Sequence, residues 1–315
     1  MGEANRKKRL PLHPGDSSGI RSPLSIKQDS PILVMCCTPI NRDDYLGELR
    51  YAVLASEFFR HLYPKSEVYI GTTPSAHIPD EYHQFFRPLR FPFEDGPFAL
   101  MRQLFYQKVL EGLPKESPIV FAGVDVLFTN HFECCVFESN YTYSYRCHPA
   151  MPYCSDFFFV SPTGKKKAIL IQEELIRMMQ WQPREIQSSW ADQISIAAVL
   201  GHLGSDDFDG SIRMAPRIPD MLLVPGDRYL YTPNDIFSSD KRKFTGSELN
   251  DFSPSMAAWS YLLENKISVH FKGNRKKGFF GLAAAAILKG RINPYRRSFS
   301  YPIEKLFDGY IEVKS

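Results

Sequence analysis

Three short stretches of the sequence combine residue types that could bind a cation, a phosphate or a sugar. The first is Gly123-Val124-Asp125, which follows the apolar run Ile119–Phe121 and precedes a second apolar run, Val126–Phe128. A carboxylate that emerges between two buried runs needs a partner, most simply a cation. Aspartate is also common in ordinary turns, so this stretch alone leaves a metal ligand and a turn residue equally open.

The second stretch is Val269–Lys276, where a predicted strand runs into the pattern His270-x-x-Gly273-x-x-Lys276. A neutral imidazole can bind Mn²⁺. Gly273 would let the backbone approach a ligand closely, and Lys276 would place a positive charge against a phosphate oxygen. A metal ion and a lysine together would neutralise a leaving diphosphate, as sugar transfer from a nucleotide-sugar requires. The alternative is a structural histidine followed by a solvated basic turn.

The third stretch is the acid–amide pair Asp192-Gln193, which begins an apolar helix predicted over about residues 190–200. The three stretches lie far apart in the chain, so they can act together only if the fold brings them to one place. In an open α/β sheet that place is the edge formed by the carboxyl ends of the strands, where such sheets bind ligands.

The elements that must position these residues alternate along the chain, as expected of an α/β protein. Compact apolar runs predict buried strands, and apolar residues at helical spacing predict helices between them. The segments 74–96 and 140–152 are expected to be irregular. The expected strands are 31–37, 67–71, 119–121, 131–137, 155–160, 221–224, 229–231 and 268–271, and the expected helices are 45–63, 98–111, 165–181, 190–200 and 254–264.

The length and composition favour one globular α/β domain with extensions at both ends. Of the 315 residues, 43% are hydrophobic and 23% are charged, which is ordinary for a globular protein. Residues 1–30 are basic and rich in Pro, Gly and Ser, which predicts a disordered arm. We expect the folded domain to span residues 31–278 and a basic, aromatic C-terminal extension to span residues 279–315.

Charge and cysteine usage restrict the class of protein further. The formal net charge of +3 is small and does not require a nucleic-acid partner. The six cysteines form no paired CxxC zinc pattern and are interpreted as buried residues in a reducing compartment. The sequence shows no secretory h-region and no stretch of the roughly 18 apolar residues that span a bilayer. We therefore expect a cytoplasmic protein.

Taken together, the three stretches resemble the GT-A glycosyltransferases, most closely family 8, which includes lipopolysaccharide galactosyltransferases and glycogenin. That family has an Asp-x-Asp after a central strand, an Asp-Gln pair at a helix start, and His-x-x-Gly-x-x-Lys near the C-terminus. The same segments occur here in the same order, so the resemblance covers roughly residues 31–278. It implies a single Rossmann-like domain with a mixed, mostly parallel sheet flanked by helices.

The resemblance also implies a nucleotide-diphosphosugar donor, usually a UDP-sugar, and Mn²⁺ or Mg²⁺. Asp125 matches the second acid of the metal motif and His270 the third metal ligand, while Gly273 and Lys276 match the phosphate-binding turn. Lys108 resembles a basic residue that these folds carry on the helix before the metal motif. The family transfers the sugar with retention of anomeric configuration.

Further residues are assigned to the sugar and the nucleoside by the same resemblance. Asp192 and Gln193 match the pair that faces the transferred sugar, where they would orient it and stabilise a cationic transition state. Asp156 occupies a position from which related enzymes approach the sugar, and it could accept a hydrogen bond from a hydroxyl or simply cap a turn. Thr38, Asp44 and Tyr45 lie where such enzymes hold the base and ribose.

One departure from the family pattern is that Gly123 replaces the first acid of Asp-x-Asp. The metal would then keep only Asp125, His270, diphosphate oxygens and water as ligands, which puts strong metal dependence in doubt. The leading hypothesis is a glycosyltransferase that acts on a glycan, lipid or protein acceptor. The alternative is a catalytically silent GT-A domain that serves as a binding or scaffold module.

The basic, aromatic extension leaves a further question open. It contains Arg291, Tyr295-Arg296-Arg297, Phe299 and Tyr301, a composition similar to the membrane-surface tails of enzymes that act on lipid-linked acceptors. Peripheral contact with a membrane surface is one interpretation, and an extension packed on its own domain is the other.

Overall fold

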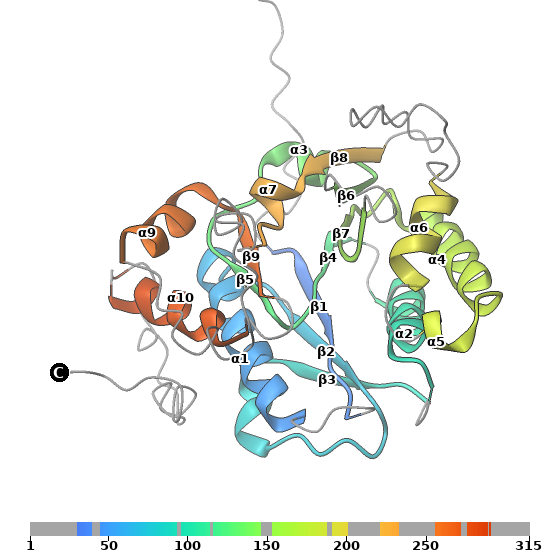
Figure 1. Cartoon of the computed structure of the whole chain (residues 1–315), viewed down its shortest axis with the longest axis horizontal. Helices are drawn as coiled ribbons and strands as arrows, with labels where there is room; N and C mark the ends of the chain where they lie inside the picture. Colours follow the sequence, from blue (N-terminus) through green and yellow to red (C-terminus); the bar gives the residue numbers. More distant parts are fainter. Residues whose placement is uncertain are drawn as a thin grey trace, which may run out of the picture.

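The computed structural model describes residues 30–39, 45–92, 96–113, 116–145, 153–187, 191–200, 221–232, 256–271, 276–288 and 290. In this part of the chain one seven-stranded sheet and one two-stranded sheet are surrounded by helices (Figure 1). The strands are β1 (Ile32–Cys36), β2 (Val68–Thr72), β3 (Arg87–Arg90), β4 (Ile119–Phe121), β5 (Val126–Phe128), β6 (Tyr141–Tyr145), β7 (Tyr153–Val160), β8 (Met221–Pro225) and β9 (Ser268–His270).

The large sheet is mixed and has the order β3-β2-β1-β4-β7-β6-β8. Strands β3, β2, β1 and β4 run parallel, β7 pairs antiparallel with both β4 and β6, and β8 returns parallel to β6. The small sheet pairs β5 antiparallel with β9. This mixed, mostly parallel sheet between helices confirms the α/β fold class predicted from the sequence.

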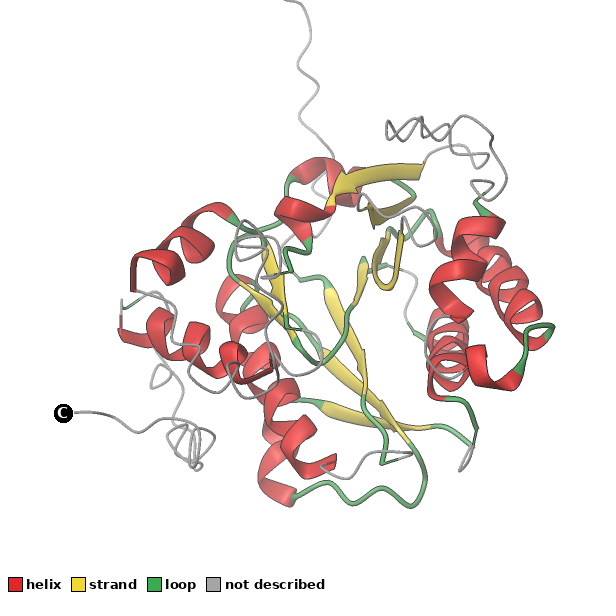
Figure 2. Ribbon diagram, viewed as in Figure 1, coloured by secondary structure: helices red, strands yellow, loops and turns green. Residues whose placement is uncertain are grey.

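Helices cover both faces of the large sheet (Figure 2). One side is covered by α1, α9 and α10, and the other by α2, α4 and α6, as Figure 1 shows at its left and right. The helices are α1 (Tyr45–Leu62), η1 (Asp80–Gln84, a 3₁₀-helix), α2 (Phe98–Gly112), α3 (Cys134–Glu138), α4 (Lys165–Gln180), α5 (Arg184–Gln187), α6 (Ala191–Val199), α7 (Gly226–Tyr229), α9 (Met256–Asn265) and α10 (Lys276–Leu288).

The central strand β1 explains why the sheet is covered on both sides. All five of its residues are buried, with Leu33 and Met35 in the core beneath α1 and with Ile32, Val34 and Cys36 in the core beneath α2. A continuous apolar strand of this kind can be buried only if helices pack on each face. Cys36 in this strand, Cys37 after it and Cys154 are buried, as predicted, but Cys134 and Cys135 on α3 are exposed, so the prediction of buried cysteines was wrong for that pair.

Four local predictions were wrong. The segment 74–96 was expected to be irregular, but it contains the 3₁₀-helix η1 and strand β3, which pairs with β2. The segment 131–137 was expected to be a strand, but Cys134–Glu138 forms one turn of helix (α3), so strand propensity there is overridden by tertiary context. The segment 140–152 was expected to be irregular, yet Tyr141–Tyr145 is strand β6. The segment 229–231 was expected to be a strand, but Gly226–Tyr229 is helix α7, and Tyr231 forms only an isolated bridge to Val269.

The described part of the predicted C-terminal extension packs into the core. Phe279 and Phe280 of α10 lie against Tyr51 of α1, with ring centroids 5.1 and 4.8 Å apart. Trp259 of α9 contacts the same helix beside Gly281, where an added Cβ would lie 3.0 Å from its ring. The chain up to Leu288 therefore contributes to the domain, whereas all of the predicted arm 1–30 except residue 30, and residues 291–315, lie outside the described residues.

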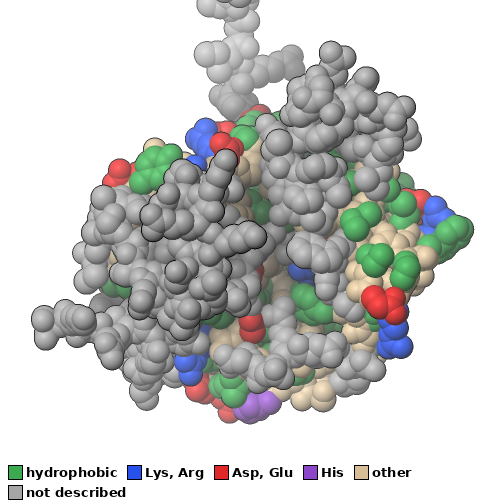
Figure 3. Space-filling model, viewed as in Figure 1, with side chains coloured by type: hydrophobic (Ala, Val, Ile, Leu, Met, Phe, Trp, Pro, Cys, Tyr) green, Lys and Arg blue, Asp and Glu red, His purple; other side chains and the backbone are tan. Residues whose placement is uncertain are grey.

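Apolar side chains are exposed on the solvent side of α4 and α5, at the right of Figure 3. Leu170, Trp181 and Ile186 belong to this surface, and the guanidinium of Arg177 lies 5.5 Å from the Trp181 ring centroid. The opposite side of α4 is buried and includes a polar residue, Gln172. Among the helices of the described residues, none has the length and hydropathy needed to cross a bilayer.

A close approach between β2 and α2 leads to a first prediction. A Cβ at Gly71 would lie 2.3 Å from the Phe105 ring, so Gly71→Ala should lower the free energy of unfolding by about 1–3 kcal/mol through overpacking. Gly112→Ala is the matched control, because an added Cβ there meets nothing within 4 Å. Equilibrium denaturation of both variants measures the difference. Equal stability of the two variants would contradict the close packing.

Candidate functional site

The carboxyl ends of the parallel strands form one edge of the large sheet. Thr38 follows β1, and Gly123 and Asp125 follow its neighbour β4. Because β7 runs antiparallel to β4, with Phe158 opposite Phe121, the first half of β7 extends beyond the carboxyl end of β4 and brings Ser155 to the same edge. This is the edge at which open α/β sheets bind ligands.

Asp125 and His270 meet at this edge. The antiparallel pairing of β5 with β9 places Val126 opposite His270, and the His270 Nε2 lies 3.2 Å from the Asp125 Oδ1. The backbone N–H of Phe271 also donates to the Asp125 carbonyl at 3.0 Å, which locks the two segments together. The structure therefore brings together the two metal ligands that were predicted from distant parts of the sequence.

The chemistry of this pair fits a divalent cation. The side chain of His270 is 5% exposed and that of Asp125 is 17% exposed, so both are largely withdrawn from water. Two ligands at right angles around an ion about 2.1 Å away would be about 3 Å apart, close to the observed separation. The Nδ1 of His270 is buried and has no hydrogen-bond partner among the described residues.

The described residues alone supply only part of a coordination shell. Within them, no group of three or more His, Cys, Asp or Glu side chains could hold a metal. Gly123 offers no side-chain ligand, as expected from the sequence. A Mn²⁺ or Mg²⁺ ion at this pair would complete its shell with phosphate oxygens and water, as such ions do in phosphate-binding sites.

Asp192 lies in a buried polar network rather than in solvent. Its side chain is fully buried in the first turn of α6, and its Oδ2 accepts hydrogen bonds from the guanidinium of Arg102 and, at 3.3 Å, from Gln103 Nε2. Its Oδ1 accepts the backbone N–H of Gln193 at 2.8 Å. Three donors therefore hold this carboxylate in place.

Arg102 and Gln103 are the residues that sequence reasoning missed. Both belong to α2, which precedes β4 and therefore begins near the carboxyl edge of the sheet. The guanidinium of Arg102 is 11% exposed, so it is largely withdrawn from water beside Asp192. The available signal was a polar pair, Arg102-Gln103, inside an otherwise apolar helix segment.

Lys108, the basic residue predicted on this helix, lies elsewhere. It is six residues further along α2, which moves it about 9 Å toward the amino edge of the sheet. Its ammonium group is 2.8 Å from the Glu111 carboxylate, and its side chain is 61% exposed. The structure thus brings Arg102, and not Lys108, against Asp192.

A cluster of hydroxyl groups lies at the carboxyl ends of β1 and β2. Tyr45 Oη and Thr72 Oγ1 are 3.2 Å apart, and burial raises the pKa of Tyr45 to about 12, an effect that the hydrogen bond to Thr72 partly offsets. The hydroxyls of Thr38 and Thr73 are buried and have no hydrogen-bond partner among the described residues. Buried hydroxyls in this state are available to a bound ligand.

The remaining predicted residues are only partly described. Asp156 is in β7 and Lys276 begins α10, but the side chains of both lie outside the described residues, as do Asp44 and Gly273 entirely. Gln193 is buried beside Asp192. Next to Asp156, the hydroxyl of Ser155 is buried without a hydrogen-bond partner in the described part of the chain.

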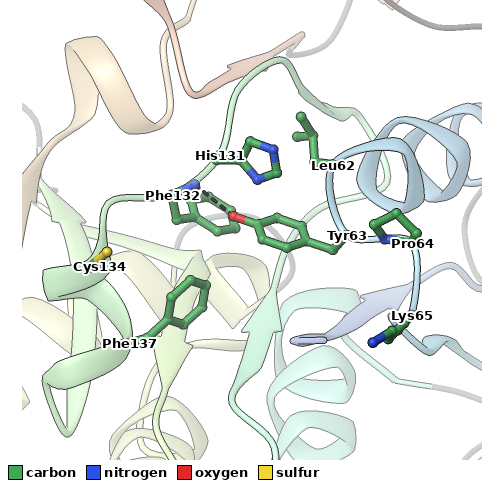
Figure 4. A pocket seen from close by; sticks show the side chains of 8 residues that line it. All are labelled: Leu62, Tyr63, Pro64, Lys65, His131, Phe132, Cys134 and Phe137. Carbon is green, nitrogen blue, oxygen red and sulfur yellow. Dashed lines mark hydrogen bonds between the residues drawn. The ribbon is translucent and has the colours of Figure 1, made fainter. Parts of the chain in front are cut away.

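A cavity of about 390 Å³ lies at the other edge of the sheet (Figure 4). Leu62, Tyr63 and Lys65 line one side before β2 begins, and His131 and Phe132 line the other beyond β5. Tyr63 and Phe132 stack at 5.8 Å, and the Tyr63 hydroxyl accepts the Phe132 N–H at 2.7 Å. This cavity is therefore separate from the Asp125–His270 pair at the opposite end of β5.

Comparisons with known proteins bear on the fold. No protein-family model and no curated protein matches the sequence. The apo form of the glycosyltransferase GlyE of Streptococcus pneumoniae TIGR4 matches with a TM-score of 0.50 and 10% sequence identity, over 87% of this chain and 65% of GlyE. This likeness, together with the sheet topology, confirms the predicted GT-A fold.

Two further solved structures are similar at lower scores. The galactosyltransferase LgtC, in complex with donor and acceptor sugar analogs, matches with a TM-score of 0.46 and 11% identity, over 89% of this chain and all of that one. A glycosyltransferase involved in glycosylation of the major capsid of PBCV-1 matches with a TM-score of 0.46 and 10% identity, over 79% of this chain and 98% of that one.

Proposed function

We propose that this protein is a glycosyltransferase that moves a hexose from a nucleotide-diphosphosugar to a glycan, lipid or protein acceptor. The donor in this proposal is a UDP-sugar. The observation that carries the proposal is the 3.2 Å approach of His270 to Asp125 at the carboxyl edge of a GT-A sheet. The carboxylate and the imidazole come from distant parts of the chain, and together they offer two ligands that a divalent cation accepts.

Asp125 and His270 would hold Mn²⁺ or Mg²⁺ together with the diphosphate of the donor. The bound ion would supply positive charge to the leaving diphosphate. Lys276 and the backbone at Gly273 would bind the same diphosphate from the following turn, as the sequence pattern predicts. Thr38, Asp44 and Tyr45 would hold the nucleoside, and the buried hydroxyls of Thr38 and Thr73 support a polar ligand at that end.

Asp192 acts in this proposal through its charge and not as a nucleophile. Both of its oxygens already accept hydrogen bonds, and Arg102 lies against it. The carboxylate therefore holds Arg102 in place, and by the resemblance it would also stabilise positive charge that develops on the sugar ring. Gln193 and Asp156 would orient sugar hydroxyls. On the basis of the resemblance, we propose that the sugar is transferred with retention of anomeric configuration. The role of Lys108 as a second basic residue of the site stays a prediction.

A second candidate is a GT-A domain that binds a nucleotide without transferring sugar. Gly123 favours it, because the residue that would complete the acidic motif has no side chain. Titration calorimetry with UDP in the presence and absence of Mn²⁺, combined with a screen of nucleotide-sugars for hydrolysis, separates the candidates. Metal-dependent binding with turnover of one donor is expected. Binding without turnover of any donor or transfer to any acceptor would favour the second candidate, and no binding would contradict both.

We also propose a cytoplasmic location with peripheral membrane contact through the basic, aromatic residues of the C-terminal extension. The packing of α10 into the core restricts this contact to the segment beyond it. Co-sedimentation with anionic liposomes should therefore decrease for a chain that ends at residue 290. Equal co-sedimentation of the shortened and full-length chains would contradict the proposed contact.

A further inference from the structure

Two buried glutamines connect the catalytic edge to the helix layer behind it. Gln103 of α2 is 0% exposed and Gln172 of α4 is 1% exposed. A buried amide costs free energy unless its hydrogen bonds are made, and both side chains make them within one network. The network ends at Asp192, the acid that lies against Arg102.

The direction of each hydrogen bond in this network is fixed by its partners. Gln103 Nε2 lies 3.3 Å from the Asp192 carboxylate and 3.4 Å from the Ser155 carbonyl oxygen. Both partners can only accept, so the nitrogen of the Gln103 amide must face them. The Gln103 oxygen then points away from Asp192, toward α4.

Gln172 completes the arrangement from the other side. Its Nε2 donates to the Gln103 Oε1 at 2.5 Å and to the Gln103 backbone carbonyl at 3.2 Å. The backbone carbonyl again accepts only, so the Gln172 nitrogen must face α2. An amide with its oxygen held in this way cannot rotate its oxygen toward Asp192.

We propose that Gln172 is a positioning residue: it fixes the Gln103 amide so that a donor, and never an acceptor, faces Asp192. The inference rests on the proposed function, in which Asp192 and Arg102 serve the sugar transfer. Without the Gln103 donor, the Asp192 Oδ2 would lose one of its two hydrogen bonds from α2. The carboxylate could then rotate and carry Arg102 with it. Neither glutamine needs to touch the substrate for this effect.

The variant Gln172→Glu tests the direction of the network, because a protonated carboxyl donates as the amide does and an ionised one only accepts. Burial and the negative charge of Asp192 should raise the pKa of the carboxyl that this substitution introduces, whereas the positive charge of Arg102 should lower it. Asp192 and Arg102 are the charged side chains that are bonded to this network. At low pH, kcat relative to wild type should stay near one. As pH rises through that pKa, the Gln103 amide should turn and relative kcat should fall about ten- to a hundredfold, with little change in KM for the donor.

Two matched variants isolate the effect. Gln172→Met keeps the length of the side chain but cannot donate a hydrogen bond. The kcat of this variant should therefore be lower than that of wild type at every pH, and the ratio of the two should not change with pH. Glu173→Gln changes the exposed neighbour on α4 and should follow wild type throughout. Wild-type kcat for both Gln172→Glu and Gln172→Met, or a flat ratio of Gln172→Glu to wild type across pH, would overturn the proposal.

A second measurement separates this inference from the proposed function. The side-chain amide resonances of Gln103 should shift with pH in Gln172→Glu and stay constant in wild type over the same range. If the wild-type protein transferred no sugar, the proposed function would fail while this nuclear magnetic resonance titration still decided the orientation of the network. Resonances that do not respond to pH in Gln172→Glu would overturn the orienting role by themselves.

Discussion

Replacing Asp125 with asparagine should lower kcat for sugar transfer by about a hundred- to a thousandfold, the usual loss when a charge-stabilising group is removed from an active site. The asparagine keeps the volume and can still contact His270, so the strand pairing of β5 with β9 should persist. It removes the negative charge that would bind the cation. Steady-state kinetics at increasing Mn²⁺ should also show a higher metal concentration at half-maximal rate.

The control for this experiment is Asp227→Asn, which changes an exposed acid on α7. It alters the net charge equally and should leave both kcat and the metal dependence unchanged. His270→Asn should resemble Asp125→Asn because it removes the other ligand of the same pair. Wild-type kinetics in both Asp125→Asn and His270→Asn would show that the pair is a structural contact, and the proposed function would lose the observation that carries it.

Replacing Arg102 with methionine should lower the free energy of unfolding by about 3–5 kcal/mol, because it leaves the fully buried carboxylate of Asp192 without its cationic partner. Gln103 and the Gln193 N–H would still donate to that carboxylate, but neither carries a charge. Urea denaturation followed by circular dichroism measures the change. The double variant Arg102→Met/Asp192→Leu should regain part of the loss, since it removes the uncompensated charge as well.

A matched control comes from the same helix. Lys108→Met breaks the exposed ion pair with Glu111, and the change in unfolding free energy should be small because solvent screens that pair. If Arg102→Met and Lys108→Met lowered the free energy of unfolding equally, the buried ion pair of Arg102 would stabilise the protein no more than the exposed ion pair of Lys108. In that case the network around Asp192 would be no more than a surface feature.

The strands and helices were largely predictable, because their apolar residues follow the periods of buried strands and amphipathic helices. The expected helix at 98–111 is α2, and the expected strand at 119–121 is β4. Strand β6 could have been found too, since Tyr141-Thr-Tyr-Ser-Tyr145 alternates and its Tyr141 and Tyr143 share one core. It was missed because tyrosines near cysteines and prolines suggested a loop.

The candidate site was predictable only in part. Asp125 and His270 were paired through a family resemblance, since no local pattern links residues on strands so distant in the sequence. The pairing of Arg102 with Asp192 depends on how α2 and α6 pack against β7, which is a property of the tertiary structure. Gln172 gave no signal, because a glutamine in an amphipathic helix is ordinarily assigned to the solvent side.

The pairing of β5 with β9 has a consequence for how the protein reaches its active form. Val126 pairs with His270, so almost half of the chain must be synthesised and folded between the two strands before they can meet. Contacts of such long sequence separation are costly in loop entropy and form slowly. The parallel strands β1, β2 and β4 are joined by much shorter connections. A nascent or truncated chain can therefore assemble most of its sheet before the proposed cation site exists, so this site should be among the last parts of the fold to form.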